Sequence, residues 1–209
     1  MDIKKIINSF VDAHADEIEA AIRSALVKES PISEIKEGDH FEYKGLEWVC
    51  LDVTTETVFA ITAKIIADMP FNDECEDGCN NWEKSTLRRF LNEDVLEEHF
   101  DTKHLVKQTS DLIADNGDKA YGTCEDYITL LTCDQYRKYR DYVPLFEKCM
   151  WTLTPLSCSA GRAYGVRGIG PSEALGSCNV SIAHGVAPVC LFKLDQLVSC
   201  GQARIITTK

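Results

Sequence analysis

The sequence is short of positive charge and of long apolar runs. It has 22 Lys and Arg against 34 Asp and Glu, a formal net charge of −12 at pH 7. Nucleic acids and anionic lipid headgroups attract basic surfaces, so we expect neither a nucleic-acid partner nor a membrane partner. No run of about 18 apolar residues is present, so no membrane-spanning helix is expected.

The N-terminus, MDIKKIINSFVDAHADEIEA, lacks the basic region and unbroken apolar run of a secretory signal. We therefore expect a cytoplasmic protein, or one built into a phage or cell-surface assembly without a signal peptide of its own.

Recognisable catalytic motifs are also missing. The sequence contains no G-x-S-x-G, no P-loop and no G-x-G-x-x-G, and the stretch VRGIGPSEALG offers only a G-x-G. These absences favour a protein that is not an enzyme.

The ten cysteines are scattered along the chain, and without a secretion signal we expect free thiols. Cys75 and Cys79 form a C-x3-C pair that supplies only two corners of a zinc tetrahedron. The acidic loop that begins at Asp73 follows part of a calcium-loop pattern, but position 12 is Lys84 rather than the required glutamate. We therefore expect no metal ion and no other cofactor.

The chain divides into an N-terminal helix, residues 1–30, and an α+β domain, residues 38–209. Apolar residues recur at helical spacing over residues 2–28, and Pro31 begins a short linker. This apolar stripe packs either on the domain or on a second copy of itself, so a homo-oligomer is possible.

Within the domain, HFEYKGLEWVCLDV alternates around Lys44 and Gly45, which predicts a β-hairpin. The segment NWEKSTLRRFLNEDVLEEHF predicts a helix. Residues 151–192 hold six of the twelve glycines, and we interpret them as loops and short strands closed by the strand APVCLF.

The order of these segments resembles the bacterial and phage family of domains DUF6273. The strand pair GLEWVCLD is similar to the family pattern G-x-x-W-x-V-L-D, with its valine one position earlier. The central helix carries N-x-W-x-x-S-x-L-R-x-x-L-N, and a tryptophan segment and a G-V-x-P segment follow. The matching residues are Gly45, Trp48, Val49, Leu51 and Asp52, then Trp82, Ser85, Leu87, Arg88, Leu91 and Asn92, then Trp151, and finally Gly185, Val186 and Pro188. The resemblance covers residues 38–192, but the two closing motifs lack the arginines of the family, at Thr152-Leu153 and at Ala187.

The closing W…G-V-x-P pattern is also similar to the C-type-lectin-type fold. That similarity implies a compact mixed domain with long irregular loops near its C-terminus, shared by sulfatase-modifying enzymes and some phage receptor-binding proteins. Fold alone does not give function.

The region 151–190 is our candidate binding surface. Between Trp151 and Cys190 it carries only three charged residues, and binding surfaces avoid unpaired charge at their centres. The side chains suited to contact a protein or carbohydrate ligand are Arg162, Tyr164, Arg167, Asn179 and His184.

We therefore predict a non-enzymatic ligand- or receptor-binding domain. Two alternatives stay open. One is an acidic intracellular inhibitor of a basic protein, since residues 1–100 contain 23 Asp and Glu against 10 Lys and Arg. The other is an enzyme of the sulfatase-modifying type that uses Cys178, Cys190 and His184.

Overall fold

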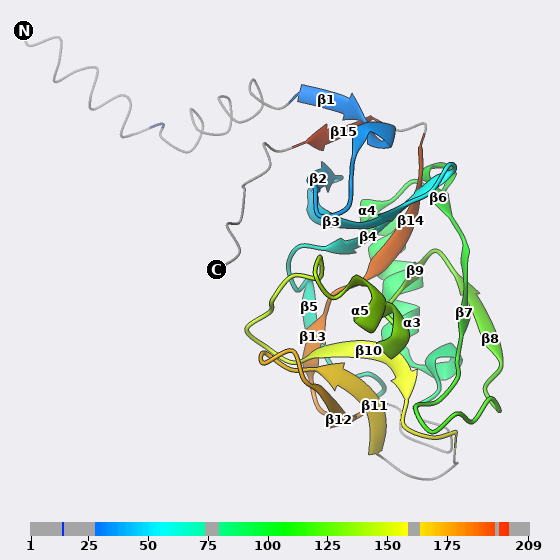
Figure 1. Cartoon of the computed structure of the whole chain (residues 1–209). Helices are drawn as coiled ribbons and strands as arrows, with labels where there is room; N and C mark the ends of the chain where they lie inside the picture. Colours follow the sequence, from blue (N-terminus) through cyan, green and yellow to red (C-terminus); the bar gives the residue numbers. More distant parts are fainter. Residues whose placement is uncertain (1–13, 15–27, 74–79, 159–163, 195–196, 201–209) are drawn as a thin grey trace, which may run out of the picture.

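The computed structural model describes residues 14, 28–73, 80–158, 164–194 and 197–200 (Figure 1). The part of the chain that the structure describes is mixed and mostly sheet, with 37% strand and 19% helix, which agrees with the predicted α+β class. The predicted helix over residues 2–28 lies outside the described residues apart from His14 and Lys28. Within the described residues, no helix combines the length and the apolar character needed to cross a membrane.

The larger sheet has eight strands, all paired antiparallel. Its order is β1 (Lys28–Pro31), β15 (Leu197–Cys200), β2 (His40–Tyr43), β3 (Leu46–Val53), β4 (Thr57–Thr62), β14 (Val189–Lys193) and β6 (Leu105–Val106), and β9 (Ile128–Thr129) also pairs with β14.

The second sheet has five strands in the order β12 (Leu175–Asn179), β11 (Tyr164–Ile169), β10 (Met150–Pro155), β13 (His184–Val186) and β5 (Ala67–Met69). Strands β10 and β13 run parallel, and the other pairs are antiparallel. The chain passes from the second sheet into the larger one between β13 and β14, as Figure 1 shows. A separate hairpin is formed by β7 (Gln108–Asp111) and β8 (Thr123–Asp126).

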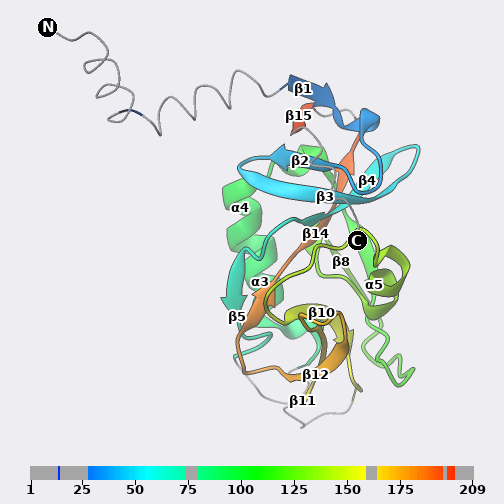
Figure 2. The ribbon, with the colours of Figure 1, turned by 60° about the vertical axis from the view of Figure 1, so that its left-hand side comes forward.

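The helices are short. One helical segment consists of η2 (Trp82–Lys84), α3 (Thr86–Phe90), the π-helical η3 (Leu91–Val95) and α4 (Leu96–His99), which confirms the helix predicted from the sequence. The others are η1 (Ile32–Glu34), η4 (Thr102–His104) and α5 (Cys133–Tyr139). In Figure 2, α3 and α4 lie on one side of β14 and α5 lies on the other.

The predicted hairpin is present, with β2 and β3 joined at Lys44 and Gly45. Both residues have positive φ, 51° and 80°, as a two-residue turn of type I′ requires. This turn sets the register in which Phe41 faces Trp48.

The central motif of the DUF6273 resemblance has a structural role. The Ser85 side chain accepts a hydrogen bond from the Arg88 backbone N–H and so caps α3. The Arg88 guanidinium binds the buried Asp126 carboxylate through contacts of 2.8–3.0 Å, and the Trp82 indole donates to the same carboxylate at 2.8 Å. Asn92 bonds both backbone groups of Ile128. The motif therefore fastens the helical segment to β8 and β9.

The tryptophans form the centre of the core. The side chains of Trp48, Trp82 and Trp151 are all buried. Phe71 contacts both Trp82 and Trp151 and so joins the helical segment to the second sheet.

One expectation about organisation is wrong. The predicted linker after Pro31 belongs to the domain, because Pro31 ends a strand of the larger sheet and the side chains of Ile32 and Ile35 are buried in the core. The glycine-rich region consists of short strands and connecting loops, as predicted, and four of its strands belong to the second sheet. The closing strand β14 is present as predicted.

Candidate functional site

The five residues predicted to form a binding surface have different positions. Arg162 lies outside the described residues. Tyr164 and Arg167 lie on β11, where the backbone pairs with Asn179 and Ser177. The Asn179 side-chain oxygen accepts hydrogen bonds of 3.1 and 3.0 Å from the backbone N–H and the hydroxyl of Ser181. That carboxamide therefore shapes the turn after β12.

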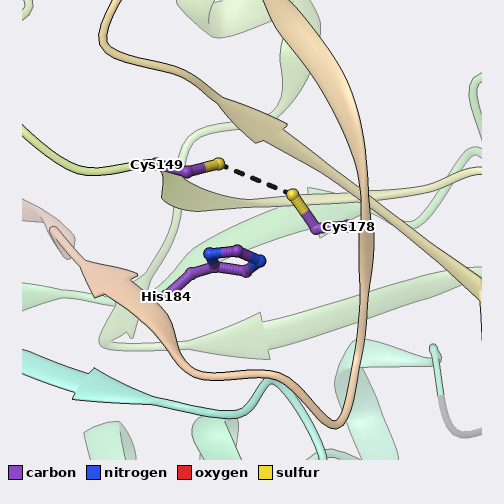
Figure 3. Close-up of side chains that lie close together, drawn as sticks. All are labelled: Cys149, Cys178 and His184. Atoms are coloured by element: carbon purple, nitrogen blue, oxygen red, sulfur yellow. Dashed lines mark hydrogen bonds between the residues drawn. The ribbon is translucent and has the colours of Figure 1, made fainter.

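His184, the fifth residue, belongs to a group of chemically reactive side chains. It lies on β13, and its ring packs edge to face against Trp151 at 4.7 Å between centroids. Potential ligand atoms of His184, Cys149 and Cys178 all lie within 4.8 Å of one another (Figure 3). We call these three residues the thiol–imidazole cluster.

The cluster joins segments that are distant in sequence. Cys149 comes directly before β10 and Cys178 lies on β12, and their sulfurs are 3.5 Å apart. Strand β11 lies between β10 and β12, and its buried Gly168 faces both sulfurs. A Cβ at position 168 would lie 2.6 Å from the Cys178 sulfur and 2.7 Å from the Cys149 sulfur. The sulfurs meet because position 168 has no side chain.

Hydrogen bonding and burial shift the pKa values of the three cluster residues in different directions. The hydrogen bond with Cys178 lowers the pKa of the Cys149 thiol to about 7, and the same hydrogen bond raises the pKa of Cys178. Burial lowers the pKa of His184, which favours the neutral ring, although Asp68 acts in the opposite direction. The hydrogen bond between the two sulfurs therefore favours a thiolate on one of them, and burial favours the neutral imidazole.

The sequence indicated only part of this cluster. The proposed nucleophilic site paired Cys178 with Cys190 and His184, whereas Cys149 is the neighbour of Cys178 and Cys190 is fully buried on β14. Sequence reasoning missed Cys149 because 29 residues separate it from Cys178. The acidic loop and the Cys75–Cys79 pair lie largely outside the described residues.

A second candidate site is a groove of about 700 Å³ between the β2–β3 hairpin and the helical segment η3–α4. Apolar side chains of Phe41, Leu46, Ile65 and Phe90 line it, and we call it the acidic groove because it also carries four carboxylates. These belong to Glu42, Glu47, Asp94 and Glu98.

Two of the groove carboxylates have basic partners, and Glu98 lies 3.7 Å from the Nε2 atom of His99. Glu47 lies 3.0 Å from His40 and 3.4 Å from Lys64, and these interactions lower its pKa although burial opposes the change. Asp94, Glu98 and Glu42 are exposed to solvent at the edge of the groove. The groove therefore combines an apolar floor with an excess of negative charge.

Together the fold and these sites define an α+β domain with an acidic groove and a thiol–imidazole cluster. Comparisons of the chain with protein-family models, curated proteins and solved structures found no match.

Proposed function

We propose that the chain is a non-enzymatic binding domain whose acidic groove takes a positively charged segment of a partner protein. The observation that carries this proposal is the combination of four carboxylates and an apolar floor in one groove of about 700 Å³. That volume is within the range of about 300–1,000 Å³ common for ligand sites.

Lys and Arg side chains fit such a groove because they have an apolar stem and a charged end. The stem would lie over Phe41, Ile65 and Phe90, while the charged end stays in water near Asp94 and Glu98. Glu47 already has two partners and Glu98 lies 3.7 Å from His99, so Asp94 and Glu42 are the groove carboxylates for which no ion pair is seen among the described residues.

Exposed ion pairs contribute only about 0.2–1 kcal/mol each, so a single contact would not hold a partner. We expect a segment with several basic residues to bind with modest affinity, and salt to weaken the complex strongly. Negative charge concentrated in residues 1–100 would also speed the encounter with such a partner.

The test is fluorescence anisotropy with a labelled peptide of alternating Lys and Leu, compared with a peptide in which Glu replaces every Lys. We expect the full chain to bind the first peptide and not the second. The double variant Asp94→Asn, Glu98→Gln should lose about tenfold in affinity, which is about 1.4 kcal/mol.

The matched control is the double variant Glu56→Gln, Asp141→Asn, which makes the same change in net charge at two exposed positions outside the groove. It should bind as tightly as the wild type. Equal losses in both double variants would mean that only overall charge attracts the peptide, and the groove would then have no special role.

Other predictions from the sequence remain proposals. They are membership of DUF6273, the C-type-lectin-type fold, a protein or carbohydrate ligand at the surface formed by residues 151–190, a homo-oligomer, and a cytoplasmic or assembly location. The β-strand backbone of this surface supports a rigid platform, since binding residues on strands are held more precisely than those on loops.

A further inference from the structure

We propose that Cys149, Cys178 and His184 bind a zinc ion through their two sulfurs and one imidazole nitrogen. This inference is independent of the acidic groove. Thiolate and imidazole ligands together favour zinc over the hard cations magnesium and calcium. The sequence lacks a full set of zinc ligands close together along the chain, whereas these three residues come together only in the folded chain.

The distances fit a tetrahedral site. Two thiolates at about 2.3 Å from one zinc ion lie about 3.8 Å apart, since tetrahedral angles separate them. The sulfurs of Cys149 and Cys178 are 3.5 Å apart, and a nitrogen of His184 lies within 4.8 Å of both. Small side-chain rotations are enough to bring the three atoms to bonding distance of one ion.

A disulfide fits this geometry less well than a metal ion. Disulfide sulfurs are about 2.05 Å apart and require Cα atoms within about 7 Å. The two cysteines reach the cluster from the two sides of β11, and two strand spacings amount to about 9 Å. An ion between the sulfurs bridges this distance without moving a strand.

The surroundings support the same arrangement. Gly168 leaves space beside both sulfurs that a Cβ would fill. Trp151 packs against the His184 ring and holds its orientation, and Trp151 is itself fixed by a 2.9 Å hydrogen bond from its indole N–H to the Met69 carbonyl.

Three protein ligands leave the fourth coordination position for water or for a ligand from outside. Cys149 and His184 are each half-buried, so the cluster is near the surface of the domain.

The experiment is a titration of the metal-free full chain, kept under a non-thiol reductant, with Co²⁺ and then with Zn²⁺. We expect one equivalent of Co²⁺ to give the sulfur-to-metal charge-transfer and d–d absorption of tetrahedral cobalt, and Zn²⁺ to displace it. Cys178→Ser and His184→Gln should each weaken binding by more than about tenfold, because even changes beyond the direct ligands have effects of that size.

Cys158→Ser is the matched control, since Cys158 is also partly buried but lies outside the cluster and bonds the Asp118 carbonyl. It should bind cobalt like the wild type. His184→Gln keeps both thiols and tests the site even where a cysteine variant fails to fold. The proposal is overturned by a reduced wild-type chain that binds no Co²⁺ or Zn²⁺, or by binding that survives both ligand substitutions.

Discussion

Replacing Gly168 by Ala is the sharpest test of the cluster, because the change adds one methyl group between two sulfurs. The new Cβ would lie 2.6 and 2.7 Å from the sulfurs of Cys178 and Cys149, and 3.2 Å from the Met150 carbonyl oxygen. Ordinary contacts of this kind are about 3.5–4.0 Å, so each sulfur must retreat by about 1 Å.

Overpacking of this kind costs about 1–3 kcal/mol. The backbone at position 168 does not have positive φ, so Ala also restricts the unfolded chain and returns about 0.4–1 kcal/mol. We expect a net loss of about 1–2 kcal/mol in the free energy of unfolding, measured by urea denaturation. Cobalt binding should fall more than tenfold, because the sulfurs are pushed from the positions that the metal requires.

The neighbouring strand supplies the control. Gly176 pairs with Gly168 across β11 and β12, and a Cβ at position 176 would meet no atom within 4 Å. Gly176→Ala should leave both stability and cobalt binding unchanged or slightly improved. If Gly168→Ala keeps wild-type stability and wild-type cobalt binding, the packing described for the two sulfurs is wrong.

Three further changes test the fold. Asp126→Asn should lower the free energy of unfolding by about 3 kcal/mol, as measured by chemical denaturation. This value is near the low end of the range for a broken buried ion pair, because the Arg88 side chain is partly exposed. The Tyr139 hydroxyl donates a 2.6 Å hydrogen bond to Asp52 and lowers the pKa of that carboxyl, so its stabilisation is present above the ordinary aspartate pKa and is lost as pH falls through the lowered value. Melting temperatures of the wild type and Tyr139→Phe should therefore converge in acid. Ile32→Ala should cost about 2–5 kcal/mol, and a change below 0.5 kcal/mol would restore the linker interpretation of this segment.

Local patterns in the sequence were sufficient to predict the hairpin and the central helix. Lys44 and Gly45 adopt the positive φ angles that a two-residue turn needs, and Ser85 caps the helix. Each of these signals lies within a few residues of the structure that it specifies, and this is why they can be found without tertiary contacts.

The sequence did not show which glycines of the glycine-rich region lie inside strands, because glycine has two opposite uses. Glycines that recur along a stretch of sequence usually indicate loops. Here Gly168 and Gly185 lie inside strands, at points where sulfur atoms and the Ile65 side chain approach the backbone too closely for any Cβ. Whether a glycine lies in a loop or in a tightly packed strand depends on the side chains that contact it. For Gly168 and Gly185 these contacts include residues that are distant in sequence.

Neither candidate site could be predicted completely, and the physical reason is the same for both. Residues 149, 178 and 184 lie close together because β10, β12 and β13 belong to one sheet. The order of strands in a sheet cannot be predicted from the spacing of cysteines along the sequence. The acidic groove likewise requires the hairpin to lie beside α4, an arrangement fixed by burial of Trp48 against Phe100. The excess of acid in the first hundred residues was visible, but its concentration in a groove was not.

Gly185 connects the two sites, and its replacement should affect both. It follows the cluster residue His184, its N–H donates to the Cys149 carbonyl at 2.9 Å, and a Cβ there would lie 2.4 Å from the end of Ile65, which lines the acidic groove. Gly185→Ala should therefore displace Ile65 and disturb Cys149, and so weaken both binding of the Lys–Leu peptide and binding of cobalt. Gly168→Ala should weaken only cobalt binding, and the groove variant Asp94→Asn, Glu98→Gln should weaken only peptide binding. If the Gly185→Ala chain binds both the Lys–Leu peptide and cobalt like the wild type, the contact with Ile65 does not control the shape of the groove.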